Sequence, residues 1–164
     1  MRYRTETDSI GSREVPEDAY YGIQSMRAAE NFRMTGLHIH PEMVRSMADV
    51  KAAAATANYE TRALDEERER AILHSCAEMR EGKFDGEIIV DPIQGGAGTS
   101  LNMNVNEVLA NRAIELLGGV KGDYKMVHPN DHPTGGRFFL GWRRKGWTRC
   151  WSMRTGSTGR TMRI

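Results

Sequence analysis

The sequence predicts a mainly α-helical domain. Apolar residues recur at helical spacing in three long segments, residues typical of helix caps flank these segments, and glycines separate them. The connection over residues 83–91 contains one short strand-like run, Ile88 to Val90, and the chain has no internal repeat. A length of 164 residues suits one modest hydrophobic core. A single helical domain is therefore the expected architecture.

The first half of the chain predicts an extended segment and two helices. Residues 7–22 contain glycine, proline and paired tyrosines without a helical or alternating period, so extended or looped chain is expected there. A short helix is expected over residues 24–32. A longer one should run from 41 to 63, because Pro41 suits the first helical position. The core face predicted for this helix consists of Met43, Met47, Val50, Ala54 and Ala57.

Two further helices are predicted in the second half. Asp65 is a favourable N-cap for the first of them, and the acidic residues that follow it suit the positive end of a helix dipole. Its expected apolar face is Ile72, Cys76 and Met79, and Gly82 is expected to end it. The last helix should run from about Ser100 to Leu117 and end at two glycines. Its predicted core residues are Leu101, Val105, Val108 and Leu109.

Charge divides the chain into two parts. All 22 acidic residues lie at or before Asp131, so residues 1–132 carry a net charge of about −7. Residues 133–164 carry eight basic residues, no acidic residue and all three tryptophans. We therefore predict a helical domain over 1–132 and an unrelated basic tail rich in Arg, Gly and Trp over 133–164.

Composition argues against several classes of protein. No run approaches the roughly 20 apolar residues of a membrane span, and the N-terminal residues contain no apolar signal core, so a cytoplasmic protein without a membrane partner is expected. Two cysteines, Cys76 and Cys150, are too few for a disulfide framework and are expected to be free thiols. His38 and His40 have no further ligand at a recognised spacing, so no metal site is predicted.

A glycine-rich run, QGGAGTSLNMNVNEVLANRA from Gln94 to Ala113, gives the strongest functional signal. A glycine turn with two hydroxyls that opens into a helix presents backbone N–H groups and a positive dipole end to a small anion. A carboxylate or phosphate is therefore the expected ligand. The run lacks the lysine of a P-loop, and taken by itself the turn also fits a plain helix cap.

Three motifs, in order, resemble the aspartase and fumarase superfamily. They are DSIGSREVPEDAYYGIQSMRAAENF from Asp8 to Phe32, the glycine-rich run, and HPNDH from His128 to His132. The Tyr20-Tyr21 pair and the Gly-Gly-Ala-Gly-Thr-Ser loop resemble the corresponding segments of aspartases more than those of fumarases. The resemblance therefore implies the N-terminal helical domain of this fold, without the central bundle of long helices.

The resemblance implies a reversible elimination that converts L-aspartate to fumarate and ammonia without a cofactor, in a homotetramer. It assigns substrate binding to Thr99 and Ser100, with Asn102 in reach of the same pocket. His128, Asn130 and Asp131 match a motif that forms a second dicarboxylate site in fumarases. A class II fumarase-like hydratase is the alternative reading within the superfamily.

The chain departs from the family after the HPNDH motif. The family's next substrate-binding motif and its serine-containing catalytic loop are not recognisable in residues 133–164, so no catalytic residue is assigned and these 164 residues are expected to be inactive alone. The tail reads as a translated wrong reading frame. Alternatively, its interleaved Arg and Trp residues would suit a module that binds nucleic acid or an anionic membrane surface, but this is the less favoured interpretation of the tail. Without the bundle, the apolar faces of helices 41–63 and 100–117 are expected to stay partly exposed, with marginal stability.

Overall fold

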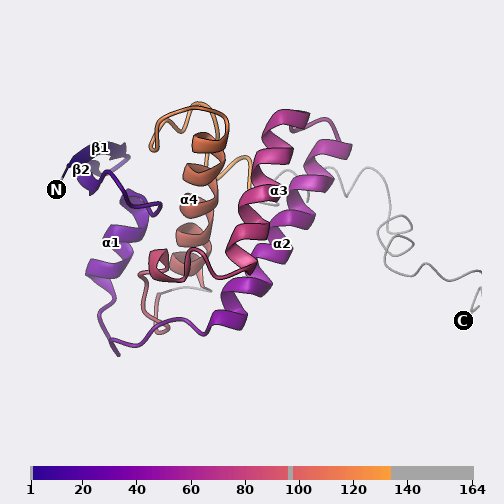
Figure 1. Ribbon diagram of the computed structural model, residues 1–164. Helices are drawn as coiled ribbons and strands as arrows, with labels where there is room; N and C mark the ends of the chain where they lie inside the picture. Colours follow the sequence, from indigo (N-terminus) through magenta and orange to yellow (C-terminus); the bar gives the residue numbers. More distant parts are fainter. Residues whose placement is uncertain (1, 96–97, 134–164) are drawn as a thin grey trace, which may run out of the picture.

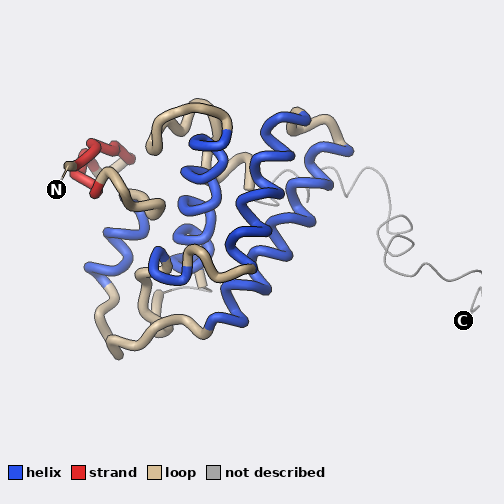
Figure 2. Tube along the Cα trace, in the orientation of Figure 1, coloured by secondary structure: helices blue, strands red, loops and turns tan. Residues whose placement is uncertain are grey.

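The computed structural model describes residues 2–95 and 98–133 of the chain. A two-stranded hairpin and a short helix, α1 (Ile23–Asn31), lie on one side of three longer helices. Figure 2 shows the three helices side by side, with irregular chain linking them at both ends. The mainly helical prediction is confirmed. The predictions for the basic tail after residue 133 lie outside the described residues.

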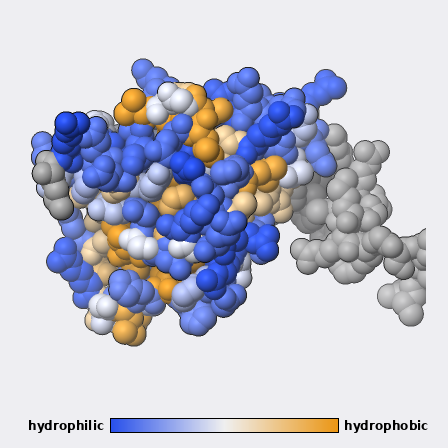
Figure 3. All heavy atoms as spheres, viewed as in Figure 1, coloured by the Kyte–Doolittle hydropathy of each residue, from blue (hydrophilic) through white to orange (hydrophobic). Residues whose placement is uncertain are grey.

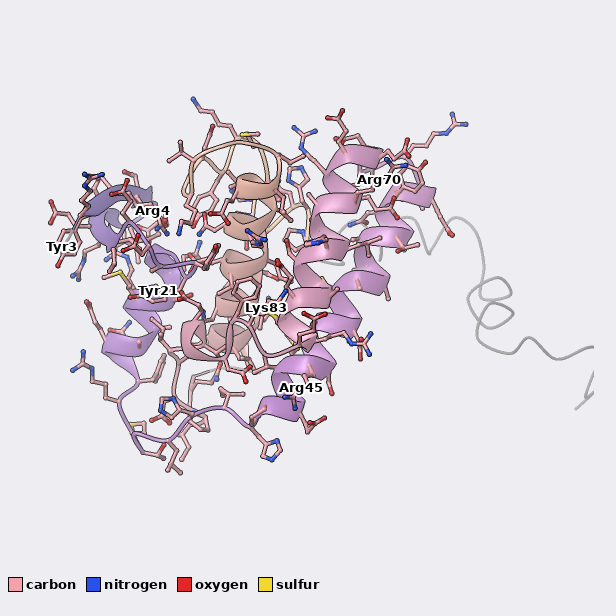
Figure 4. All side chains as sticks on the ribbon, viewed as in Figure 1. Tyr3, Arg4, Tyr21, Arg45, Arg70 and Lys83 are labelled. Atoms are coloured by element: carbon pink, nitrogen blue, oxygen red, sulfur yellow. The ribbon has the colours of Figure 1, made fainter. Side chains whose placement is uncertain are left out.

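The N-terminal segment is extended, as predicted, but its strands pair with each other. Strand β1 (Tyr3–Asp8) runs antiparallel to β2 (Gly11–Pro16), with Tyr3 opposite Pro16 and Asp8 opposite Gly11. The guanidinium of Arg4, labelled in Figure 4, donates to the backbone carbonyls of Pro16, Ala19 and Tyr21 at 2.8–2.9 Å. The side chain of Arg4 therefore ties the hairpin to the segment that leads into α1.

Helices α2 (Pro41–Glu60) and α3 (Glu66–Arg80) form an antiparallel pair. Their starts are confirmed: Pro41 is the first residue of α2, and the Asp65 carboxylate caps α3 by accepting from the Arg68 N–H at 2.9 Å. The predicted core residues Ile72, Cys76 and Met79 are buried. Helix α2 ends three residues earlier than predicted, at Glu60.

Helix α4 (Thr99–Leu116) is the central element and contacts α1, α2 and α3. All four of its predicted core residues are buried, so the expectation that this helix keeps an exposed apolar face is wrong. The same helix buries four polar side chains completely or almost completely, namely Asn104, Asn106, Glu107 and Asn111. Apolar exposure is found at the C-terminal end of α4, where Leu116 is 39% exposed, and in the loop after it, where Val120 is 74% exposed. Figure 3 shows apolar atoms gathered at the top of this face of the molecule.

The predicted core face of α2 is wrong in part. Met43 and Val50 are 51% and 60% exposed, whereas Val44, Ala48 and Lys51 lie inside. The apolar residues of α2 form two stripes that are offset by about one residue. The stripe with the smaller side chains, which includes Val44 and Ala48, faces α3 and α4. Partial exposure of an apolar face on α2, as expected from the sequence, is confirmed.

A buried carboxylate joins α1 to α4. Glu107 is 1% exposed and accepts from the backbone N–H groups of Gly22, Gln24 and Ser25 at 2.9–3.0 Å, and from the Ser25 hydroxyl. These are orphan donors at the positive end of α1. Burial raises the pKa of Glu107, although the Ser25 and Gln24 donors favour its ionised form. Glu107 thus serves as an N-cap supplied from another helix.

A second carboxylate, Asp91, ties the loop after α1 to the segment before α4. It accepts from the N–H groups of Thr35, Gly36 and Ile93 at 2.8–3.0 Å and from the Thr35 hydroxyl. Burial opposes ionisation, but these donors outweigh it and lower the pKa of Asp91 to about 2. The connection around residues 34–37 is therefore held against the chain that leads into the glycine-rich turn.

Replacing Glu107 should destabilise the protein through α1. We expect Glu107→Ala to cost about 2–4 kcal/mol in the free energy of unfolding, because it leaves several buried donors without an acceptor. Glu107→Gln should cost less, since its amide oxygen can still accept from Gly22 and Ser25 and only the Gln24 N–H loses its acceptor. Urea unfolding measures both. Glu14→Gln, on the exposed side of β2, is the control, and an equal cost for all three variants would contradict the role of Glu107.

Asp91 should make stability depend on acid. Because its folded pKa of about 2 lies below the usual 3.8, the ionised carboxylate stabilises the fold at neutral pH, and this contribution is lost as the pH falls from about 4 towards 2. We expect Asp91→Asn to be less stable than the wild type at neutral pH and the difference to shrink over that range. Thermal unfolding at several pH values measures it; a constant difference would refute the assignment.

Candidate functional site

The glycine-rich turn leads directly into α4. Gly98 has a φ of +81°, a left-handed conformation that glycine adopts without strain, and α4 begins at the next residue, Thr99. Gln94 fixes the turn from the other side, because its side chain accepts from the Leu101 N–H at 2.7 Å and donates to the Asp91 carbonyl at 3.1 Å. Gly96 and Ala97 lie outside the described residues.

The turn lies against the end of α1. A Cβ atom added at Gly95 would come within 2.7 Å of the Phe32 ring, so only glycine allows this close approach. Phe32 also lines a cavity of about 470 Å³ between the hairpin, α1 and the loop after α4. Two of the three sequence motifs therefore meet at Phe32, and the third, at His128, lines the same cavity.

The structure places the three predicted substrate-binding residues in the first turn and a half of α4. Thr99 is exposed at the first helical position, Ser100 is 9% exposed, and Asn102 is half-buried. The Asn102 side-chain oxygen accepts from the ammonium of Lys51 on α2, at 2.6 Å. Lys51 is not part of the apolar face that the sequence predicts for α2. Its position beside two apolar stripes gave no signal that would have identified it as a neighbour of this site.

The second predicted group gathers on a turn after α4. The His128 N–H donates to Nδ1 of His132 at 2.7 Å, and Nδ1 of His128 accepts from the Asn130 N–H at 3.2 Å. Asp131 lies 3.4 Å from the same His128 nitrogen and pairs with it when the histidine is protonated. Burial lowers the pKa of His132, and the charge of Arg68 adds to this effect.

The two predicted groups lie at different levels along α4. His128 and Asn130 line the 470 Å³ cavity together with Glu107, whereas Asp131 lines a neighbouring cavity of about 520 Å³ that His128 also borders. Eight residues separate Thr99 from Glu107, which corresponds to about 12 Å along the helix axis. Within the described chain, the predicted substrate-binding residues at the start of α4 are therefore separate from the group around His128.

The charged side chains Asp8, Arg27 and Glu107, which line the His128 cavity, already have hydrogen-bond partners. Asp8 binds Arg27 with a 2.8 Å contact between Oδ2 and Nε, and Arg27 also donates to the Gly11 carbonyl at 3.1 Å. Both Glu107 oxygens are taken by the start of α1. An anion in this cavity would meet two carboxylates and one guanidinium, so the charges of these three side chains together oppose its binding.

Other candidate residues have structural explanations. His38 and His40 are exposed, and Nδ1 of His40 accepts from the Glu42 N–H at 3.2 Å as the cap of α2. Cys76 is a buried free thiol whose pKa burial raises to about 12, so it is a poor nucleophile. Cys150 lies outside the described residues. Within residues 2–95 and 98–133, no helix is both long and apolar enough to cross a membrane.

Comparison with known proteins gives a consistent result. A family described as "Lyase" matches residues 11–137. Aspartate ammonia-lyase from a Bacillus species is 54% identical over 129 residues, which cover 79% of this chain and 28% of that protein. Class II fumarate hydratase from Halobacterium salinarum is 50% identical over 135 residues, covering 82% of this chain and 28% of that protein. The chain thus spans less than a third of the length of these relatives.

Solved structures share the fold. The crystal structure of fumarate lyase:delta crystallin from Brucella melitensis in native form superposes with a TM-score of 0.79 at 50% identity, over 80% of this chain and 31% of that one. The class II fumarase from Schistosoma mansoni gives a TM-score of 0.75 at 37% identity, over 80% and 28% of the two chains. Together with the family match over residues 11–137, these likenesses show that the chain belongs to the lyase family that includes aspartate ammonia-lyases and class II fumarases.

Proposed function

We propose that this chain supplies the dicarboxylate-binding segment of an aspartate ammonia-lyase, with Thr99, Ser100 and Asn102 as its substrate-binding residues. The observation that carries the proposal is the glycine turn at Gly98, which opens straight into α4 and leaves Thr99 exposed at the helix N-terminus. Free N–H groups and the dipole favour a carboxylate at such a helix end. The relatives named aspartate ammonia-lyase support the choice of L-aspartate.

The chemistry requires fixed donors at this place. Elimination of ammonia from L-aspartate begins with loss of a weakly acidic C3 proton, and the developing charge spreads onto the neighbouring carboxylate. Preorganised donors that receive this charge stabilise the transition state more than the substrate. Hydroxyl and amide groups held by a helix suit that task because they need little reorganisation. No metal or other cofactor is part of the proposal.

A fumarase-like hydratase is the second candidate. It would eliminate water instead of ammonia from a similar dicarboxylate, and the relative from Halobacterium salinarum, named class II fumarate hydratase, is 50% identical. Seven relatives at 50–54% identity are named aspartate ammonia-lyase, which favours the aminated substrate. A comparison of L-aspartate with L-malate as ligands distinguishes the two.

A second dicarboxylate site at His128, Asn130 and Asp131 belongs to the same proposal. Its support is the shared turn that brings these residues together at the mouth of two adjoining cavities. The paired carboxylates nearby make this the weaker of the two sites at neutral pH.

Assembly and activity of the protein also follow from the family resemblance. We infer that the active form is a cytoplasmic homotetramer, as the resemblance implies, and that a polypeptide limited to these 164 residues does not turn over substrate. The second inference is supported by the coverage of only 28% of the relatives' length and by the lack of a recognisable catalytic serine loop in the sequence. Loss of a positioned base typically costs about two to four orders of magnitude in rate.

Thr99→Ala tests the binding site. We expect the wild-type polypeptide to bind L-aspartate more tightly than L-malate, and the variant to bind L-aspartate about tenfold more weakly, because a hydrogen bond to a charged group is lost. Isothermal titration measures the affinities. Thr61→Ala, at the far end of α2, is the matched control and should bind like the wild type. Unchanged affinity in Thr99→Ala would refute the assignment.

An absorbance assay for fumarate tests inactivity. We expect the purified 164-residue polypeptide to form no fumarate above background from L-aspartate or L-malate, since it contains no assigned base. A full-length aspartate ammonia-lyase serves as the positive control in the same assay. Robust turnover by the polypeptide alone would contradict the expectation and would require a base among its own residues.

A further inference from the structure

Lys51 is a buried cation without a carboxylate partner in the described part of the chain. It lies on the inner face of α2, is 5% exposed, and forms no ion pair with a carboxylate of residues 2–95 or 98–133. An ammonium group loses most of its hydration on burial, and this cost is usually offset by an opposite charge. The position of Lys51 therefore needs an explanation other than stability.

Within the described part of the chain, Lys51 donates a hydrogen bond to a residue of the site proposed above. Its ammonium donates to Oδ1 of Asn102 at 2.6 Å, in the second turn of α4. An ammonium group has only donors, so it can bind only the oxygen of an amide side chain. The Asn102 amide is thereby fixed with its oxygen toward α2 and its NH2 group pointing away.

The NH2 group of Asn102 is available to a ligand. No acceptor for it occurs among the residues that the structure describes, and the side chain is only half-buried. It lies three residues after Thr99, on the turn where the first N–H groups of α4 are found. A neighbouring cation also draws electron density from the amide and makes the NH2 group a stronger donor.

We propose that Lys51 is a positioning residue for the dicarboxylate site: it orients Asn102 so that the NH2 group donates to the carboxylate of the ligand. The inference rests on the proposed function, since it assumes a carboxylate at the start of α4. Burial lowers the pKa of Lys51, and a bound carboxylate nearby favours the charged form of the ammonium. Ligand and lysine would therefore stabilise each other.

A purely structural role predicts a different outcome. If the Lys51 to Asn102 hydrogen bond only held α2 against α4, Lys51→Met would lower stability and leave ligand affinity alone. If Lys51 is kept for the ligand, replacing a buried charge with an apolar side chain of similar length should leave stability unchanged or raise it while weakening binding. The affinity for the ligand should thus fall in Lys51→Met while the stability of the protein does not.

The experiment uses the full 164-residue protein labelled with ¹⁵N and titrated with succinate, a dicarboxylate that carries no leaving group. NMR shifts of the Asn102 side-chain amide and of the Thr99 and Ser100 backbone amides report binding. The variants are Lys51→Met and Lys51→Arg. The matched control is Lys83→Met, because Lys83 is an exposed lysine that pairs with Glu78 and Glu81 (Figure 4).

We expect succinate to bind Lys51→Met about tenfold to a hundredfold more weakly than the wild type, Lys51→Arg to recover part of the loss, and Lys83→Met to behave like the wild type. The Tm of Lys51→Met should not fall. In the wild type itself, NOEs between the succinate methylene protons and the Asn102 NH2 protons are expected. This measurement keeps the test decisive if a variant does not fold.

Three outcomes count against the inference, and they are distinguishable. Succinate affinity of folded Lys51→Met within about twofold of the wild type overturns the role of Lys51 but leaves the dicarboxylate site intact. If succinate binds at Thr99 but shows no NOEs to the Asn102 NH2 group, the role of Lys51 is likewise overturned and the dicarboxylate site is kept. A wild-type protein that does not bind succinate at the start of α4 overturns the proposed function and, with it, the role of Lys51.

Discussion

The fold depends on one buried carboxylate, that of Glu107. It accepts four hydrogen bonds from the first turn of α1, although it belongs to the middle of α4. The hairpin and α1 bury a small cluster of their own, made of Val15, Ala19 and Ile23, and Tyr20, Tyr21 and Ala28 pack only partly buried against the main core. Glu107 therefore supplies much of the attachment that hydrophobic burial does not, and its cost in desolvation is offset by orphan donors that would otherwise stay unpaired.

Other polar side chains extend this junction along the same segment. Glu6 accepts from the Ile23 N–H at 2.9 Å and from the Tyr124 hydroxyl at 3.0 Å, and Glu87 accepts from the Tyr20 N–H at 2.7 Å. Asn111 donates to the Tyr20 carbonyl at 2.8 Å. The acidic surplus of residues 1–132 is thus not only a solvated surface, because several of its carboxylates are internal acceptors for residues 20–25. The match between donors and acceptors at this junction fixes how α1 meets α4.

Sequence patterns predicted the helices because their signals are local. Caps such as Asp65, a proline at the start of α2 and glycines after α4 act on their own neighbours in the chain, and all of them hold. Patterns that depend on contacts between distant segments were less informative. Periodicity could not decide whether Met43 or Val44 faces the core, and a glutamate in mid-helix gives no sign that it caps another helix. The hairpin depends on pairing of two strands, which neither segment specifies alone.

The same distinction between local signals and distant contacts explains which parts of the candidate site could be predicted from the sequence. The glycine turn and its hydroxyls could be predicted as a candidate site because they are contiguous in the sequence, whereas Lys51 contacts Asn102 from 51 residues away and lies outside the predicted apolar face of α2. The positive charge of Lys51 makes the electrostatic potential at the start of α4 differ from that of the His128 cavity. A dicarboxylate at the start of α4 would meet the positive end of the helix dipole and the buried ammonium of Lys51, whereas the His128 cavity, two turns further along, is lined by Asp8 and Glu107. Both carboxylates there already have partners, and the Arg27 guanidinium is bound to Asp8, so the His128 cavity is less favourable for an anion than the start of α4. Helix α4 therefore presents its favourable electrostatic potential at its N-terminus, and that is where the first carboxylate of a ligand should bind.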